Sequence, residues 1–143
     1  MKPTLLIAES DADLRDVYRK FLGERDYEVE TASDGLDCLA KLRQRMPAVL
    51  VLDLELPWGG GDGVLAWLRE HRVTAGLPVV LTAAAGCSPD ATKDIRPPVV
   101  EFLPKPFTLT TLLWSVRTAV AKKGREEPFN LNRAAGCSEL FIG

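Results

Sequence analysis

The sequence has few of the residues that hold small secreted domains together or bind zinc. Its only cysteines are Cys38, Cys87 and Cys137, and no two of them form a C-x-x-C pair. An odd number of widely spaced cysteines argues against a disulfide framework and against a zinc site. We therefore expect reduced thiols, either as small core residues or exposed, in a cytoplasmic protein.

Excess charge and long apolar runs are also lacking. The formal net charge is −2 over 143 residues, which provides no basic field for nucleic acid, so we expect no direct nucleic-acid binding. The apolar run near the N-terminus is too short for a signal peptide, and no later run approaches the roughly 18 residues of a membrane span. We therefore expect no membrane association. The length and the ordinary composition predict a single domain without internal repeats.

Common enzyme signatures are missing as well. The sequence contains no G-x-S-x-G, H-E-x-x-H or P-loop motif. The segment 61–66 satisfies a relaxed dinucleotide-binding pattern, but it follows the third expected strand instead of the first, and no acid ends the next strand to bind a ribose. We therefore give little weight to the hypothesis that the chain is a small doubly wound enzyme or nucleotide binder.

A dense apolar run at 48–52 ends on a carboxylate, Asp53. A short run this rich in Val and Leu predicts a strand buried on both faces, as in parallel sheets that are covered by helices. Ligands of open α/β sheets bind just outside the carboxyl ends of the strands. Asp53 is therefore the first candidate for a functional residue.

The whole chain alternates strand and helix. Strands are expected at 4–8, 27–31, 48–53, 79–81 and 99–103. Ser33 is the expected N-cap of the second helix, and the last helix is capped near Thr108. Residues 58–63 are expected to form a flexible loop before the third helix. Pro97-Pro98 limits residues 88–96 to a short helix or an irregular loop.

These units define the fold class and its extent. Five β/α units predict an α/β, doubly wound parallel sheet with right-handed crossovers and helices on both faces. Residues 1–123 are expected to form the domain, and residues 124–143, which lack a helical period, a flexible C-terminal tail. Trp67 and Trp114 are expected to be packing residues.

Polar side chains follow the strands at one edge of this sheet. Glu9 and Ser10 follow the first strand, Asp53 and Thr82 end the third and fourth, and Lys105 follows the fifth. Two carboxylates, two hydroxyls and an ammonium suit a divalent metal and a phosphoryl group. Carboxylates about 4 Å apart repel each other by a few kcal/mol at an effective dielectric constant of about 20, so Glu9 and Asp53 need a cation. Magnesium suits them because it prefers oxygen ligands.

Four segments carry a family resemblance, and they stand at the ends of strands one, three, four and five. They are Glu9-Ser10-Asp11, Leu52-Asp53-Leu54-Glu55-Leu56-Pro57, Leu81-Thr82-Ala83 and Phe102-Leu103-Pro104-Lys105-Pro106-Phe107. In this order and spacing they resemble the receiver domain of two-component response regulators over residues 4 to about 122. The resemblance implies a flavodoxin-like sheet with strand order 2-1-3-4-5.

The resemblance also implies roles for individual residues. Asp53 accepts a phosphoryl group from a histidine kinase or phosphotransfer protein, and the domain then switches an output partner whose identity the sequence does not give. Mg²⁺ binds Asp53, the Glu9 and Ser10 positions and the backbone carbonyl of Glu55. Lys105 and Thr82 hold phosphoryl oxygens. In addition, Phe102 is the aromatic switch and the Lys105-Pro106 bond is cis. We expect a monomer or weak dimer with no enzymatic activity beyond metal-assisted self-phosphorylation and dephosphorylation.

Three departures from the family pattern support a second hypothesis. Ser10 stands where the family usually has a second acid, so magnesium should bind more weakly unless Glu9 or Asp11 reaches the site. The loop after Pro57 is about two residues longer than usual, and the helix expected within residues 88–96 is weak. A receiver-like interaction module that works without phosphorylation is therefore the alternative function.

Some of these residues have simpler readings. Ser10 or Asp11 could cap the first helix. Trp58 is either a loop anchor against the sheet or a fluorescent reporter beside the site. His71, the only histidine in the sequence, lies near the end of the third helix and therefore at the opposite edge of the sheet from Asp53, where it cannot act as a base.

Overall fold

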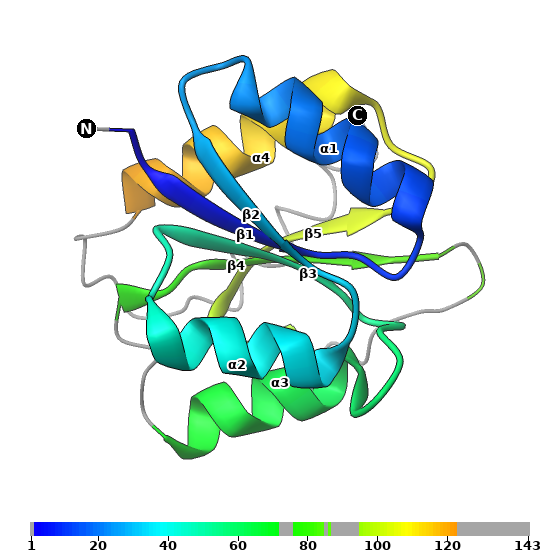
Figure 1. The fold of residues 1–143 in the computed structure, drawn as a ribbon, viewed down its shortest axis with the longest axis vertical. Helices are drawn as coiled ribbons and strands as arrows, with labels where there is room; N and C mark the ends of the chain where they lie inside the picture. Colours follow the sequence, from blue (N-terminus) through cyan, green and yellow to red (C-terminus); the bar gives the residue numbers. More distant parts are fainter. Residues whose placement is uncertain (1, 72–75, 85, 87–94, 123–143) are drawn as a thin grey trace.

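A computed structural model of the chain describes residues 2–71, 76–84, 86 and 95–122, and it contains one five-stranded parallel sheet (Figure 1). The strand order is β2-β1-β3-β4-β5, and every neighbouring pair is parallel. The strands are β1 (Thr4–Ala8), β2 (Glu28–Ala32), β3 (Val49–Asp53), β4 (Val79–Ala83) and β5 (Val99–Pro104). The predicted class and strand order are confirmed.

Helices cover both faces of the sheet. They are α1 (Ala12–Gly23), α2 (Gly35–Gln44), α3 (Gly60–Glu70) and α4 (Leu109–Lys122). α1 and α4 lie on one face, and α2 and α3 lie on the other (Figure 1). In the described part of the chain, no helix is long and apolar enough to cross a membrane.

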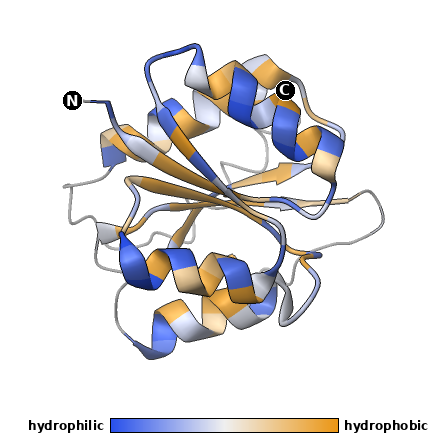
Figure 2. Cartoon of the chain, in the orientation of Figure 1, coloured by the Kyte–Doolittle hydropathy of each residue, from blue (hydrophilic) through white to orange (hydrophobic). Residues whose placement is uncertain are grey.

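The core has two halves, one on each side of the sheet. Alternate residues of β3 enter different halves, because successive side chains of a strand point to opposite faces. Val49 and Val51 pack with α1 and α4, whereas Leu50 and Leu52 pack with α2 and α3. Figure 2 shows the strands as mainly hydrophobic and the outer faces of the helices as mainly hydrophilic. β3 is therefore buried on both faces, as its composition predicts, and Asp53 lies at the end of a strand that is buried along its whole length.

The start of α3 differs from the sequence-based expectation. Residues 58–63 were expected to form a loop, but the helix begins at Gly60. The reason is close packing, because a Cβ at Gly61 would lie 2.6 Å from Leu54 Cα and 2.7 Å from the Asp53 carbonyl oxygen. Gly61 therefore allows the first turn of α3 to rest directly on the backbone at the end of β3.

The helix caps are partly as predicted. Thr108 Oγ1 accepts a hydrogen bond from Thr111 N–H at the start of α4, as expected. The N-cap of α2 is Asp34, not Ser33, since the Asp34 backbone is extended and its carboxylate accepts from Asp37 N–H. The expected weak helix at 88–96 falls largely outside the described residues, as do Cys87, Cys137 and the tail at 124–143.

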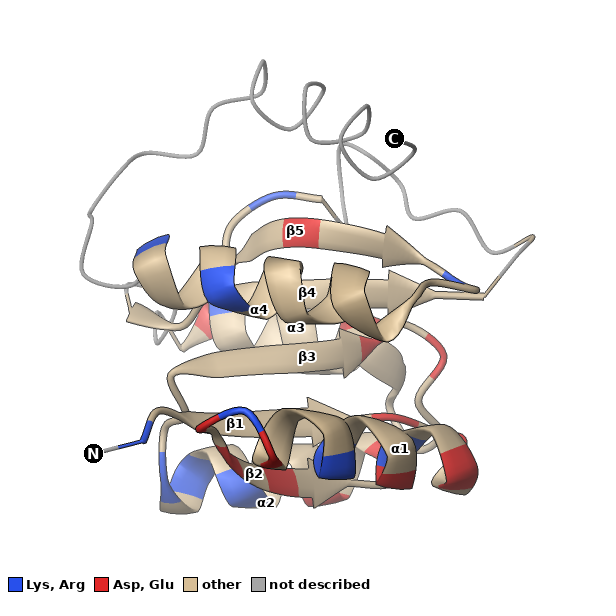
Figure 3. Cartoon of the chain, turned by 90° about the horizontal axis from the view of Figure 1, so that it is seen from above, with Lys and Arg blue, Asp and Glu red and all other residues tan. Residues whose placement is uncertain are grey.

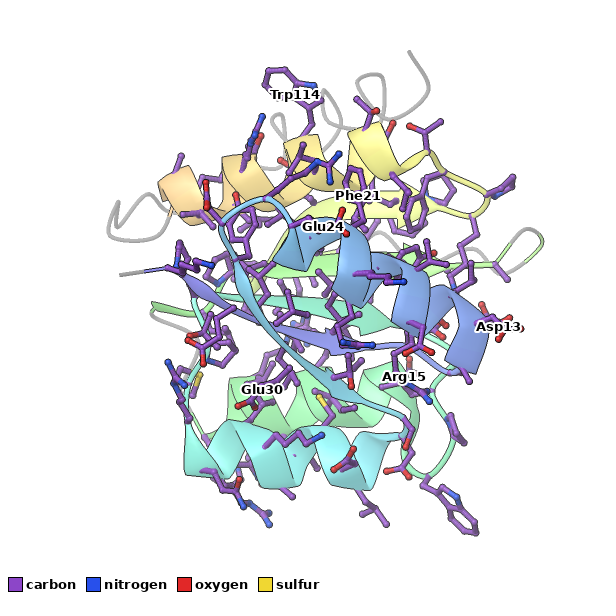
Figure 4. The ribbon with its side chains drawn as sticks, turned by 45° about the horizontal axis from the view of Figure 1, so that its top comes forward. Asp13, Arg15, Phe21, Glu24, Glu30 and Trp114 are labelled. Atoms are coloured by element: carbon purple, nitrogen blue, oxygen red, sulfur yellow. The ribbon has the colours of Figure 1, made fainter. Side chains whose placement is uncertain are left out.

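The tryptophans are placed differently from one another. Trp67 packs against the core half under α2 and α3, as expected. Trp114 is 64% exposed and points away from α4 (Figure 4), so its expected packing role is wrong. Trp58 is 73% exposed, which argues against a role as a loop anchor, and its use as a fluorescent reporter stays a prediction. Cys38 is a buried free thiol.

Candidate phosphoacceptor site

The carboxyl ends of β1, β3, β4 and β5 meet at one edge of the sheet. Asp53 stands opposite Thr82 in the β3–β4 register, and Lys105 N–H donates to the Ala83 carbonyl just beyond Thr82. Glu9 and Ser10 follow β1 directly, beside the end of β3. Acidic residues mark this edge in Figure 3. The sheet thus brings together the strand-end residues that the sequence indicated.

Asp53 is buried, with 1% of its surface exposed, and both carboxylate oxygens accept hydrogen bonds. Ser10 Oγ donates to Oδ2 at 2.6 Å and Ser10 N–H donates to the same oxygen at 3.2 Å. Glu55 N–H donates to Oδ1 at 3.0 Å. Burial alone would raise the pKa of Asp53, but the donors from Ser10 and Glu55 outweigh it and lower the pKa below the usual value. Asp53 is therefore ionised at neutral pH.

Glu9 is equally buried, but it depends on an ion pair. Lys105 Nζ lies 2.7 Å from Glu9 Oε1 and 3.6 Å from Asp53 Oδ2. Burial raises the pKa of Glu9, and the contact with Lys105 offsets only part of this effect. Burial would lower the pKa of Lys105, but the carboxylates around it raise the pKa above its usual value. The cation that the two carboxylates require is thus supplied by the protein itself.

Asp11, and not Ser10, caps α1. The Asp11 carboxylate accepts from Asp13 N–H and Leu14 N–H, and Asp11 N–H donates to Glu9 Oε2 at 3.0 Å. The Asp11 carboxylate therefore serves the helix and does not reach the site, whereas the Ser10 side chain is free to bind Asp53. Arg15 of α1, labelled in Figure 4, donates to the Glu9 carbonyl at 2.9 Å and fixes the end of β1.

Thr82 and Phe102, the two residues expected to act as the switch, lie in β4 and β5. Thr82 is 2% exposed, next to Asp53, and its carbonyl accepts from Leu54 N–H at 2.8 Å. Phe102 is partly buried and packs against the core half under α2 and α3. The Lys105-Pro106 bond is cis, as predicted.

Glu55 and His71 are the remaining residues considered for the site. The Glu55 carboxylate accepts a hydrogen bond from Ala84 N–H at 2.6 Å. From the sequence, a role was assigned only to the backbone carbonyl of Glu55, although the position of this acid, two residues after Asp53, was a sign that its side chain could also take part. His71 follows the C-terminal end of α3, and its Nδ1 contacts the Trp67 carbonyl, so it is far from the strand ends, as expected.

The oxygen atoms at this edge fit magnesium in kind. Two carboxylates, the Ser10 hydroxyl and the Glu55 carbonyl are the hard ligands that Mg²⁺ prefers. The described residues contain no group of three or more His, Cys, Asp or Glu side chains that could hold a metal. Ser10 supplies a neutral oxygen next to the Glu9 and Asp53 carboxylates. The donor set therefore suits Mg²⁺ with two carboxylate charges.

Comparison with known proteins identifies the family. A model described as response regulator receiver domain matches residues 5–117. The DNA-binding dual master transcriptional regulator RpaA of Synechocystis is 31% identical over 139 residues, which cover 97% of this chain and 56% of that protein. The transcriptional regulatory protein TctD of Salmonella typhimurium is 34% identical over 108 residues, or 76% of this chain and 47% of that one.

A solved structure supports the fold. The chemotaxis response regulator CheY4 of Vibrio cholerae superimposes with a TM-score of 0.71 at 22% identity, covering 83% of this chain and 99% of that one. The chain spans about half the length of the curated relatives that it matches. Receiver domains bind Mg²⁺ at their phosphorylation site and interact with histidine kinases and output domains. The family match over most of the chain, together with the strand order, shows that the chain belongs to the receiver domain family of two-component response regulators.

Proposed function

We propose that Asp53 accepts a phosphoryl group from a histidine kinase or phosphotransfer protein, and that the phosphorylated domain changes its interaction with an output protein. The observation that supports this best is a buried carboxylate at the end of β3 that stays ionised and lies 3.6 Å from the Lys105 ammonium. A carboxylate must be ionised to attack phosphorus, and the ammonium is near enough to neutralise the transferred group.

The chemistry assigns a task to each side chain. An Asp53 oxygen forms a bond to the phosphorus while the bond from phosphorus to the donor's imidazole nitrogen breaks, which leaves an acyl phosphate on Asp53. Lys105 holds one phosphoryl oxygen, and the Thr82 hydroxyl donates to another. Phe102 then moves inward as Thr82 shifts. The domain catalyses no reaction beyond its own phosphorylation and dephosphorylation.

Magnesium binding is part of the proposal, with reduced affinity. Glu9, Asp53, the Ser10 hydroxyl and the Glu55 carbonyl would hold the ion, which supplies positive charge to the phosphoryl oxygens when bound. Two features lower the affinity of the site for Mg²⁺. Ser10 adds no charge, and Glu9 is already paired with Lys105 at 2.7 Å.

The relatives are named as transcriptional regulators, but for this chain we propose a protein as output partner and no direct contact with nucleic acid. A cytoplasmic location and a monomer or weak dimer remain predictions. So does the division into a domain at 1–123 and a flexible tail at 124–143.

The test is a titration with magnesium and then with a small-molecule phosphodonor, while tryptophan fluorescence and intact mass are recorded. A phosphate-sized mass gain in the wild type that is lost in Asp53→Asn supports the proposal. Trp58, which is exposed and follows Asp53 by five residues in the sequence, is the tryptophan expected to report metal binding.

The alternative is an interaction module that works without phosphorylation. One observation favours it: all four carboxylate oxygens of Glu9 and Asp53 have protein partners, so the site is satisfied by its own residues. Absence of both a mass gain and a metal response at millimolar magnesium would sink the phosphoacceptor proposal and leave this one.

A further inference from the structure

The turn that carries Lys105 is held at two points. Lys105 lies between β5 and α4, and its backbone N–H donates to the Ala83 carbonyl at 2.7 Å, which ties the start of the turn to β4. Two residues later, the Phe107 ring stacks on Tyr18 of α1, with 5.6 Å between the ring centroids and 24° between the ring planes. Aromatic pairs at this separation attract each other beyond the effect of their buried area. The second anchor of the turn is therefore a side chain of α1.

Tyr18 is a firm support for this turn because it is buried. It is 5% exposed and belongs to the core half under α1 and α4, together with Leu112 and Val116. Phe107 is partly buried and packs against the same cluster. Protein interiors are close-packed, so a buried ring has little room to move. Phe107 is thus held against a part of α1 that is itself fixed by the core.

The same helix also holds the carboxylate that pairs with Lys105. Arg15 lies three residues before Tyr18, on the same side of α1, and donates to the Glu9 carbonyl at 2.9 Å. Glu9 Oε1 in turn lies 2.7 Å from Lys105 Nζ. α1 therefore holds the end of β1 through Arg15 and the turn after β5 through Tyr18. Both members of the ion pair are attached to one helix.

The Tyr18 phenol is also within the field of the acidic edge. Burial raises the pKa of Tyr18, and the negative charges of Glu9, Asp53 and Asp11 raise it further. Such Coulomb interactions weaken with distance, so these charges act on the phenol only because it lies near the strand ends. The hydroxyl is protonated at neutral pH. Tyr18 therefore contributes a ring and an uncharged hydroxyl near the ion pair.

We propose that Tyr18 is a positioning residue, which sets the place of the Lys105 ammonium through its contact with Phe107. The ammonium lies 3.6 Å from Asp53 Oδ2, where it can neutralise an incoming phosphoryl group. A lysine side chain is long and flexible, so its ammonium stays at this place only if the backbone that carries it is fixed. The inference rests on the proposed roles of Asp53 and Lys105.

Phosphorylation kinetics test this role. The rate of mass gain is measured against acetyl phosphate concentration, with magnesium, for the wild type, Tyr18→Leu, Tyr18→Phe and Phe107→Leu. Tyr18→Leu and Phe107→Leu should each lower the maximal rate on the order of tenfold, because a displaced ammonium neutralises the transferred group less well. The variant with both changes should be no slower than either single variant, since the two rings act as one unit. Tyr18→Phe keeps the ring and should retain the wild-type rate.

Val116→Ala is the matched control for a loss of core packing. Val116 is buried in the same core half, in the middle of α4, and is not part of the turn. Its substitution should lower stability in urea unfolding and leave the maximal rate of the folded protein near the wild-type value. A similar loss of rate in Val116→Ala, or a wild-type rate in Tyr18→Leu, would overturn the proposal.

NMR of the lysine ammonium groups gives a readout that does not depend on phosphorylation. The Lys105 signal should move towards that of an unpaired lysine in Tyr18→Leu and Phe107→Leu. The signal of Lys122, which pairs with a different carboxylate at 3.3 Å, should stay unchanged. An unchanged Lys105 signal in both variants would contradict the role of Tyr18. A wild type that gains no mass from any donor would instead refute the role of Asp53, so the two failures are distinguishable.

Discussion

The ends of β1 and β3 carry buried carboxylates that face the same lysine, yet the two groups behave differently. The pKa of Glu9 is raised and that of Asp53 is lowered. Asp53 accepts from a hydroxyl and two backbone N–H groups, whereas Glu9 relies mainly on Lys105. Neutral donors fixed by the fold thus keep Asp53 ionised, whereas Glu9 depends on the Lys105 side chain. Of the two, Asp53 is the carboxylate that suits the proposed role of nucleophile, because its ionisation does not depend on Lys105 alone.

The largest expected effect concerns the backbone at the end of β3. Gly61→Ala should destabilise the protein by roughly 3 kcal/mol, because the new Cβ would overlap backbone atoms of Asp53 and Leu54 that cannot move aside. Gly63→Ala, two residues later in the same helix, meets nothing within 4 Å and should stabilise it by about 0.5–1 kcal/mol. Urea unfolding of both variants measures the difference. Similar effects in the two would show that α3 does not rest on β3 in this way.

The next effect concerns metal binding at the end of β1. Ser10→Asp adds a third carboxylate beside Glu9 and Asp53 and should tighten Mg²⁺ binding about tenfold or more, since the ion then meets another negative oxygen ligand. Ser10→Asn is the neutral control of the same size. Magnesium titration followed by tryptophan fluorescence gives the affinities. Equal affinities in these two variants would contradict the explanation based on charge.

The smallest expected effect concerns the hydrogen bond between Ser10 and Asp53 and how its contribution to stability varies with pH. Ser10→Ala removes the 2.6 Å hydrogen bond to Asp53 and should raise the pKa of that carboxyl group. Folding lowers the pKa of Asp53, so the ionised carboxylate stabilises the folded protein at pH values above 3.8, the pKa of Asp53 in the unfolded chain. This stabilisation is lost as the pH falls through and below that value. The loss of stability in Ser10→Ala should therefore be about 1–2 kcal/mol at neutral pH and smaller in acid. Urea unfolding across this pH range measures it, and a loss that does not vary with pH would argue against the role of Ser10.

Much of this arrangement could be predicted from the sequence because it follows from local composition. The Val and Leu runs determine the strands, and parallel strands must bring Asp53, Thr82 and Lys105 to one edge. What was missed depends on contacts between distant segments. The early start of α3 requires Gly61 to lie against β3, and nothing local distinguishes this glycine from its neighbours.

The same limit applies to the charges of the site. The sequence indicated that Glu9 and Asp53 need a cation, but that Lys105 provides it became evident only from the distances in the fold. Asp11 and Ser10 were equal candidates for the cap of α1 until the hydrogen bonds separated their roles. The contact between Glu55 and Ala84 joins residues that are 29 positions apart, so the sequence shows an acid near Asp53 but does not identify its partner.

The most direct test of the central claim is to map the phosphoryl group after treatment with a phosphodonor and magnesium. The account predicts one phosphate-sized mass gain that hydroxylamine removes, as expected of an acyl phosphate, located on the peptide that carries Asp53 and lost in Asp53→Asn. A mass gain that persists in Asp53→Asn, or a wild type that gains none, would contradict it.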